Sequence, residues 1–200
     1  MTTAHGFALF ETTIGTCAVA WNDHGLTSVQ LPGASHALRR RASVASEVVP
    51  PPAIQSTIDA MVGLLEGKPS DLSCVGLDMA GISEFDRCVY AVARTIPPGA
   101  TLSYGDIAAR LGEPAWPAAR NVGQALGRNP FPIVVPSHRV VAAGGKLGGF
   151  SGPGGLKTKL RLLSIEAAFS SAGSRVAFET ARAGARSAAA LDCPLFAQLQ

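Results

Sequence analysis

The sequence is poor in charged residues and contains no long uninterrupted apolar segment. Only 16% of its 200 residues are charged and 47% are hydrophobic, a balance typical of folded globular proteins and not of disordered chains. No apolar run approaches the roughly 20 residues that a membrane-spanning helix needs. The N-terminus, MTTAHGFALFETT, lacks a basic region followed by an apolar stretch, so no signal peptide is predicted. We therefore expect a cytoplasmic protein with no membrane partner.

Cysteine is scarce and scattered, at Cys17, Cys74, Cys88 and Cys193. The sequence has neither a Cys-x-x-Cys pair nor a cluster of histidines, which excludes the usual zinc-binding patterns. None of the cysteines adjoins a histidine, so they are expected to be buried free thiols of a reducing compartment. We expect no metal and no cofactor.

The net charge of +3 is too small to indicate nucleic-acid binding, but its distribution is uneven. Residues 101–166 contain eight Lys or Arg and three Asp or Glu, a balance of +5 that leaves −2 for the rest of the chain. A basic segment of this kind fits a surface that faces phosphates, and it fits an ordinary solvated face equally well.

The first part of the chain, residues 1–80, predicts a small α/β domain. Short apolar runs separated by turn residues predict strands over 7–10, 17–21, 26–31 and 75–79, and apolar residues at helical spacing predict a helix over 54–65 that stops at Gly67. Residues 34–52 are basic and then proline-rich, which is typical of a surface loop.

Residues 81–168 predict a second, mainly helical domain, so the fold class is α+β. Ser83 and Asp86 resemble a capping box, and the helix that they begin ends before Pro97. Short helices over 104–111 and 117–127 form a helix-turn-helix candidate, although two helices that pack in a core give the same pattern. A glycine-rich loop over 144–155 predicts a flexible flap, and a leucine-rich helix ends at Glu166. The Ala- and Arg-rich tail, 169–200, is predicted to be a loosely docked helix or disordered.

The segment VVPSHRVV, residues 134–141, is an apolar run interrupted by Pro136-Ser137-His138-Arg139. A hydroxyl beside an imidazole is the pairing expected of a nucleophile and its general base. Residues 136–140, Pro-Ser-His-Arg-Val, also resemble the Pro-Cys-His-Arg-Val motif of the O6-alkylguanine-DNA alkyltransferases and the related alkyltransferase-like proteins. Further matches follow in family order: Ile96-Pro97-Pro98-Gly99, Ser103-Tyr104-Gly105, Ala119-Arg120-Asn121-Val122-Gly123, Arg128-Asn129-Pro130 and Gly149-Phe150-Ser151-Gly152.

The resemblance implies a partner, double-stranded DNA that contains O6-alkylguanine. Tyr104 resembles the tyrosine that helps rotate the nucleotide out of the stack, and Arg120 resembles the residue that fills the vacated space. Arg128 and Arg139 are expected to add further DNA contacts. Base flipping is physically required because the O6 atom is hidden inside a duplex.

The resemblance also implies the active-site residues. His138 and Glu166 resemble the pair that deprotonates the family's cysteine through a water, and Asn129 resembles the asparagine hinge between the recognition helix and the active-site strand. Ser151 resembles the flap serine that contacts the guanine oxygen. The substrate pocket is expected to be lined by Tyr104, Pro132, Val140, Ser151 and Gly152.

The sequence departs from the family where the alkyl acceptor should lie, because Ser137 replaces the cysteine. A thiol with a pKa of about 8.5 can become a thiolate at neutral pH, whereas a serine hydroxyl is a much weaker acid. Displacement at an alkyl carbon also lacks the tetrahedral intermediate that serine enzymes stabilise with an oxyanion hole. Suicidal transfer to Ser137 is therefore expected to be absent or very weak.

Three hypotheses remain. The first is a monomeric DNA-repair protein that binds and holds the lesion and recruits another repair pathway, either as a natural alkyltransferase-like protein or as a Cys→Ser form of a true alkyltransferase. The second is an active repair enzyme in which Ser137, His138 and Glu166, or a water, perform the chemistry. The third is a protein-interaction module, which predicts no salt-dependent affinity for DNA.

Overall fold

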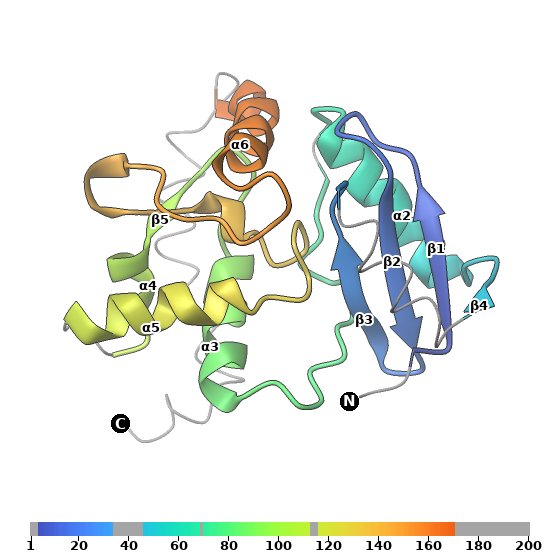
Figure 1. Cartoon of the computed structure of the whole chain (residues 1–200), viewed down its shortest axis with the longest axis horizontal. Helices are drawn as coiled ribbons and strands as arrows, with labels where there is room; N and C mark the ends of the chain where they lie inside the picture. The colour runs from blue at the N-terminus through green and yellow to red at the C-terminus, as the bar shows by residue number, and fades with distance from the viewer. Residues whose placement is uncertain (1–3, 34–45, 69, 113–115, 171–200) are drawn as a thin grey trace. The chain divides into compact units, whose positions relative to one another are not determined.

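The computed structural model describes residues 4–33, 46–68, 70–112 and 116–170, and the chain divides into two compact units (Figure 1). The first unit comprises Met1–Gly81 with the short segments Pro130–Val134 and Gly152–Gly154. The second comprises Ile82–Asn129, Val135–Ser151 and the chain from Gly155 onward. Helices and small sheets occur together, which confirms the predicted α+β class.

The first unit is built on a four-stranded sheet in the order β3-β2-β1-β4. Its strands are β1 (Gly6–Phe10), β2 (Cys17–Asn22), β3 (Gly25–Gln30) and β4 (Ser46–Glu47). The β2–β3 hairpin turns tightly because Asn22 Oδ1 accepts a hydrogen bond from the His24 N–H at 2.8 Å and Gly25 has a φ of 131°. These first three strands confirm the strands predicted over 7–10, 17–21 and 26–31 from short apolar runs.

Helix α2 (Pro52–Leu65) lies across one face of this sheet (Figure 1). Pro52 occupies the first turn, where its missing N–H costs no hydrogen bond. The helix buries one stripe of side chains: Ile54, Thr57, Ile58, Met61, Leu64 and Leu65. The chain then leaves the helix through Gly67, whose φ of 78° suits glycine, as predicted.

Two predictions in this unit are wrong. Residues 75–79 do not form a strand, because only Leu77 makes an isolated bridge, to Leu26. The segment is held instead by a buried side-chain hydrogen bond of 2.7 Å from Asn22 Nδ2 to Asp78 Oδ2. Residues 46–47 of the predicted surface loop form β4, which pairs in parallel with β1; residues 34–45 lie outside the described part of the chain.

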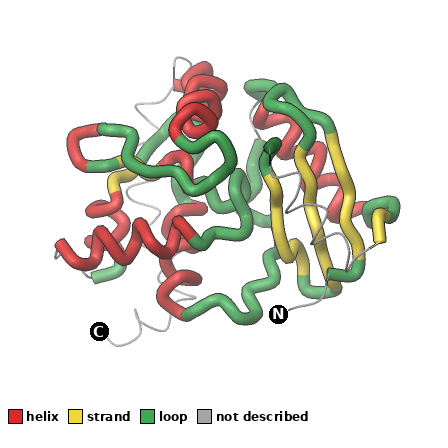
Figure 2. Tube along the Cα trace, in the orientation of Figure 1, coloured by secondary structure: helices red, strands yellow, loops and turns green. Residues whose placement is uncertain are grey.

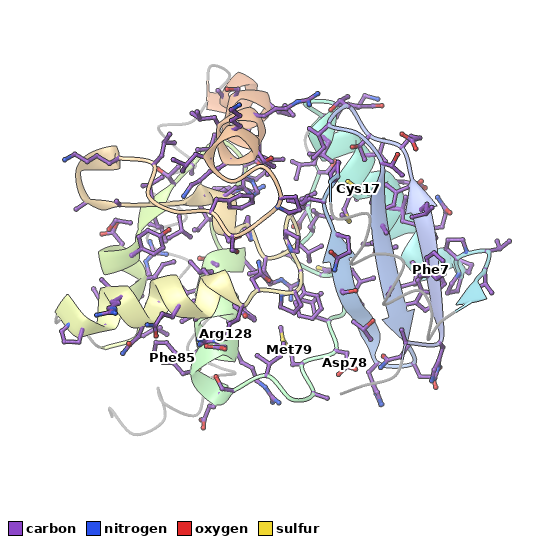
Figure 3. All side chains as sticks on the ribbon, in the orientation of Figure 1. Phe7, Cys17, Asp78, Met79, Phe85 and Arg128 are labelled. Carbon is purple, nitrogen blue, oxygen red and sulfur yellow. The ribbon has the colours of Figure 1, made fainter. Side chains whose placement is uncertain are left out.

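The cysteines also differ in part from the expectation of buried free thiols. Cys17 is free and buried in β2, where burial raises the pKa of its thiol to about 11. Cys74 is free but exposed, and Cys88 is disulfide-bonded. Figure 3 shows the position of Cys17 on the sheet.

The second unit consists of helices joined by long loops around a two-stranded parallel sheet (Figure 2). In chain order its elements are α3 (Glu84–Arg94), β5 (Leu102–Ser103), α4 (Tyr104–Arg110), α5 (Trp116–Gly127), the 3-10 turn η1 (Ser137–Arg139), β6 (Val140–Val141), the 3-10 turn η2 (Ala143–Gly145) and α6 (Leu156–Ser170). Its core includes Val89, Val92, Ile107, Val122, Ala125 and Leu162.

The helix starts in this unit follow from their capping residues. Ser83 Oγ accepts a hydrogen bond from the Asp86 N–H at 3.2 Å, as predicted, and Ser103 forms a complete capping box with Asp106 at the start of α4. Helices α4 and α5 lie next to each other. The turn predicted between them over 112–114 lies outside the described residues except for Gly112. The first two residues of the predicted tail, 169 and 170, are the last two of α6. Residues 171–200 lie outside the described part of the chain. Among the described residues, no helix combines the length and apolar composition that crossing a membrane requires.

Candidate functional site

Ser137 lies in a tight 3-10 turn between two buried segments of the second unit. Its N–H donates to the Val135 carbonyl at 2.8 Å, and the Arg139 N–H donates to the Pro136 carbonyl at 2.9 Å. Directly after the turn, β6 pairs in parallel with β5, which precedes α4. These bonds fix the backbone on both sides of Ser137, whose residue exposure is only 9%. The position of Ser137 is therefore fixed by the hydrogen-bonded backbone around it.

A cavity of about 910 Å³ opens at Ser137, and we call it the pocket. Its walls come from α4, α5, the turn that holds Ser137 and the glycine-rich loop. The lining residues are Ser103, Tyr104, Gly105, Ala119, Arg120, Gly123, Gln124, Leu126, Gly127, Ser137, Ala142, Ala143, Gly149, Phe150 and Ser151. Most of them are small or apolar, which suits a flat uncharged ligand.

The glycine-rich loop is fixed over Tyr104 by hydrogen bonds to its backbone. The Tyr104 hydroxyl donates to the Gly149 carbonyl at 3.3 Å, and the Ala142 N–H donates to the Lys146 carbonyl at 2.7 Å. Gly148 has a φ of 64°, and a Cβ there would lie 3.0 Å from a Tyr104 ring carbon. The loop thus lies against the tyrosine that lines the pocket.

Lys159 of α6 is fully buried beneath this loop. Its Nζ donates to the Val140 carbonyl at 2.6 Å and to the Gly149 carbonyl at 3.1 Å, and it lies 6.0 Å from the centre of the Tyr104 ring. Because burial disfavours the charged amine, the pKa of Lys159 is lowered to about 8. Lys159 therefore joins β6 to the loop that covers the pocket.

His138, Arg139 and Glu166 form a buried hydrogen-bonded group. Glu166 Oε1 lies 3.0 Å from His138 Nε2 and 2.7 Å from Arg139 Nη2, and Glu166 Oε2 accepts from Arg139 Nε at 2.9 Å. Arg139 Nη1 also donates to the Ile96 carbonyl at 2.6 Å, and Glu166 Oε2 accepts from the Gly99 N–H at 3.3 Å. Helix α6 is thereby fastened to the turn that carries Ser137.

The charge states of this group follow from its surroundings. Burial alone would raise the pKa of Glu166, but hydrogen bonds from His138 and Arg139 and their positive charge outweigh it and lower the pKa to about 2. The pKa of His138 is lowered because complete burial disfavours imidazolium more than Glu166 favours it. At neutral pH the group therefore holds an ionised carboxylate, a guanidinium and a neutral imidazole.

Acidification is expected to destabilise the protein through this group. Because the Glu166 pKa lies at about 2 in the folded state and near 4.5 when unperturbed, its stabilisation is complete above about pH 4.5 and is lost as pH falls toward 2. The loss is on the order of 3 kcal/mol, and His138 adds to it below its ordinary value of 6.5, since its folded-state pKa is also lowered. Urea unfolding measured between about pH 7 and pH 2 checks this. Glu166→Gln should flatten the curve below pH 4.5, and an equally steep curve would contradict the assignment.

The structure brings four of the predicted site residues into one pocket: Tyr104, Arg120, Ser137 and Ser151. His138 and Glu166 are hydrogen-bonded to each other, as expected of a relay. In the described part of the chain, Ser137 makes no direct hydrogen bond with His138, so a proton would have to pass through an intervening molecule such as water. Asn129 Nδ2 donates to the Val135 carbonyl at 2.9 Å, next to the turn.

Other predicted residues lie elsewhere. Arg139 was expected to contact DNA, but its side chain is 7% exposed and is bonded to Glu166, so its position in the core corrects that expectation. Arg128 makes a bidentate pair with Asp86. Pro132, Val140 and Gly152 do not line the pocket.

Two residues of this region were missed from the sequence. Lys159 is one of several basic residues in KTKLRLL and carries no signal of burial, and Asp86 was noted only as a capping residue. The spacing of Lys159, Leu162 and Glu166 places them on one face of α6, and this helical periodicity is the sequence signal that indicates burial of Lys159.

The fold and pocket define a two-unit α+β protein in which a hydroxyl, backed by a buried His–Glu pair, faces a cavity beside a helix pair. The family model described as "6-O-methylguanine DNA methyltransferase, DNA binding domain" matches residues 84–168. A methylated-DNA–protein-cysteine methyltransferase of Methanothermobacter thermautotrophicus is 38% identical over 148 residues, which cover 74% of this chain and 77% of that protein.

Two further similarities bear on the site. A protein of Thermus thermophilus named "DNA base-flipping protein" is 40% identical over 110 residues, covering 55% of this chain and 71% of that one. The crystal structure of Mycobacterium tuberculosis OGT in complex with DNA matches with a TM-score of 0.64 and 33% identity, covering 80% of this chain and 92% of that one. The chain belongs to the O6-methylguanine-DNA methyltransferase family.

Proposed function

We propose that this protein binds duplex DNA, rotates O6-alkylguanine out of the base stack into the pocket, and holds it there without accepting its alkyl group. The observation that carries the proposal is Ser137, which lines the pocket together with Tyr104, Arg120 and Ser151 and stands in a motif that resembles the family's Pro-Cys-His-Arg-Val. The hydrogen-bonded His138–Glu166 pair and the lining by Tyr104, Arg120 and Ser151 support lesion recognition, and the hydroxyl of Ser137 supports binding without transfer.

The charge states support a binding role for the serine. A neutral His138 and an ionised Glu166 could accept a proton through a water, but a serine hydroxyl is too weak an acid to give up its proton to that relay and become an alkoxide. Displacement at a methyl carbon also gains nothing from an oxyanion hole. A flipped base is therefore expected to meet a hydrogen-bonding hydroxyl and to keep its alkyl group.

The position of Arg120 supports entry of the base from DNA. Its side chain is exposed on α5 and also lines the pocket, so it can leave the surface and fill the gap that a flipped nucleotide leaves. A planar guanidinium recovers part of the lost stacking and adds attraction to phosphates. Helices α4 and α5 are proposed to act as the helix-turn-helix that presents Arg120, and the DNA complex and the base-flipping name of the two relatives agree with such a role.

A lesion that is held and not repaired has to be removed by other enzymes. We therefore propose that the cytoplasmic, monomeric protein marks the damaged base and recruits a second repair pathway to it. This part of the proposal depends on the absence of transfer to Ser137, because a repaired base would need no second pathway.

Incubation with duplex DNA that contains one O6-methylguanine tests the function directly. Mass spectrometry of both molecules should show unchanged lesion and unchanged protein, while titration shows tighter, salt-sensitive binding than to undamaged DNA. A protein that gains one methyl group would overturn the proposal, and loss of the lesion without a protein adduct would indicate turnover. Salt-independent or undetectable DNA binding would favour a protein-interaction module.

Arg120→Ala tests base flipping in the same assay, with Arg87→Ala as its matched control. Arg120→Ala should weaken lesion binding by about tenfold or more, because intercalating side chains compensate for unstacking that costs a few kcal/mol. Arg87→Ala, an exposed arginine of α3 that does not line the pocket, should leave the lesion preference unchanged. Equal effects of the two substitutions would argue against base flipping.

A further inference from the structure

Arg128 and Asn129 follow α5 directly and bind two different segments of the second unit. Arg128 donates from Nε to Asp86 Oδ2 at 3.0 Å and from Nη2 to Asp86 Oδ1 at 2.7 Å. The next side chain, Asn129, donates from Nδ2 to the Val135 carbonyl at 2.9 Å. Figure 3 labels Arg128, whose partner Asp86 lies in the first turn of α3. The end of α5 is thus connected both to α3 and to the residues that precede Ser137.

Asp86 is well suited to hold Arg128 in one place. Its side chain is only 8% exposed, and its backbone N–H is bonded to the capping Ser83. The carboxylate lies in the first turn of α3, where the helix dipole favours negative charge. A carboxylate that is largely removed from water needs strong hydrogen-bond donors, and a bidentate guanidinium provides two in fixed geometry.

A second link joins the same two helices one turn further along α3. The Tyr90 hydroxyl, on a side chain that is almost fully buried, donates to the Ala125 carbonyl in the last turn of α5 at 3.0 Å. The Arg128 N–H in turn donates to the Gln124 and Ala125 carbonyls. Helix α3 therefore holds the C-terminal end of α5 at two points, through one charged and one neutral contact.

The end of α5 matters because it forms one wall of the pocket. Gln124, Leu126 and Gly127 line the pocket immediately before Arg128, and the Val135 carbonyl that Asn129 binds also accepts the Ser137 N–H. Because Arg128 and Asn129 are adjacent, a shift of Arg128 away from Asp86 moves Asn129 and loosens the turn at Ser137.

We propose that Arg128 is a positioning residue, which together with Asp86 sets the wall of the pocket and the turn at Ser137, and thereby determines how well the protein distinguishes a lesion from normal guanine. This inference rests on the proposed lesion-binding function. It differs from the expectation that Arg128 contacts DNA. The side chain of Arg128 is 58% exposed, so a phosphate contact is the alternative that an experiment has to separate.

Binding of Asp86→Asn and Arg128→Gln variants to duplexes with and without O6-methylguanine, over a range of salt concentrations, separates the two roles. If Arg128 positions the site, both variants lose about tenfold in the ratio of lesion to undamaged affinity, and the double variant loses no more than either single one. The salt dependence stays that of the wild type. If Arg128 binds a phosphate, Arg128→Gln weakens both duplexes equally and lowers the salt slope by about 0.9, whereas Asp86→Asn strengthens binding. That pattern would overturn the proposal.

Two additions keep the test decisive if the charged variants unfold or if the lesion is not bound. Tyr90→Phe removes only the hydroxyl bond to α5 and should lower the lesion preference in the same direction. Arg87→Gln, next to Asp86, should not, because Arg87 Nε donates to the Ile82 carbonyl before α3. Hydrogen exchange of the Ser137 amide needs no DNA and should accelerate in Asp86→Asn, Arg128→Gln and Tyr90→Phe. Unchanged exchange would refute the coupling, whereas wild-type protein that shows no lesion preference would refute the proposed function alone.

Discussion

Replacing Ser137 with cysteine is expected to give a protein that removes a single methyl group per molecule from O6-methylguanine, whereas the function proposed for the wild type is to hold this lesion. The sulfur would take the hydroxyl's place in the pocket, with Tyr104 and Ser151 beside it. A thiol of ordinary pKa, about 8.5, is within reach of a neutral His138 and an ionised Glu166 acting through a water, and a serine hydroxyl is not. The sulfur–carbon bond forms as the O6–carbon bond breaks, and the departing guanine takes up a proton.

Intact-protein mass spectrometry after incubation with O6-methylguanine duplex measures this change. Ser137→Cys should gain one methyl group at position 137 in a single turnover, and adding Glu166→Gln should slow the transfer. The exposed free thiol of Cys74 is an internal control, because it should remain unmodified in both wild type and variant. Lesion binding without transfer in Ser137→Cys would show that the relay cannot activate a nucleophile in this pocket.

Replacing Arg139 with methionine is expected to destabilise the protein by about 3–5 kcal/mol, because it leaves the ionised Glu166 buried without its guanidinium. The double variant Arg139→Met/Glu166→Met should be far less destabilised, since it buries no unpaired charge. Lys157→Met, on an exposed position of the same helix α6, should change stability by less than about 0.5 kcal/mol. Urea unfolding measures all three; a single variant within 1 kcal/mol of the wild type would contradict a structural role for the pair.

The parts of the fold that the sequence predicts are those set by local patterns. Strands β1 to β3 follow from short apolar runs and the Asn22–Gly25 turn, and α3 follows from the Ser83 cap. The wrong strand over 75–79 and the missed β4 have one cause, because an extended segment becomes a strand only if another strand pairs with it. That pairing depends on residues distant in sequence.

The same limit applies to the site. The motifs predict Tyr104, Arg120, Ser137 and Ser151 as site residues, because their order along the chain resembles that of a known family, and all four line the pocket. Pro132, Val140 and Gly152 were also expected to line it and do not. Burial of charged side chains was not predictable in this way. From the sequence alone, Arg139 and Lys159 look like surface residues. In the fold, Arg139 pairs with Glu166, and Lys159 donates to two backbone carbonyls. Whether a charge lies inside depends on such partners, and hydropathy does not reveal them.

The buried group of His138, Arg139 and Glu166 has a consequence for how activity can be lost and regained during evolution. Exchange of sulfur for oxygen at position 137 alters one atom of a side chain that takes no part in joining α6 to the active-site turn. Loss of Glu166 would instead leave the Arg139 guanidinium buried without its carboxylate and weaken the attachment of α6 to that turn. Selection for a folded protein is therefore enough to preserve Arg139 and Glu166, whatever residue stands at position 137. A change at position 137 alone can then alter the chemistry of a site that folding maintains.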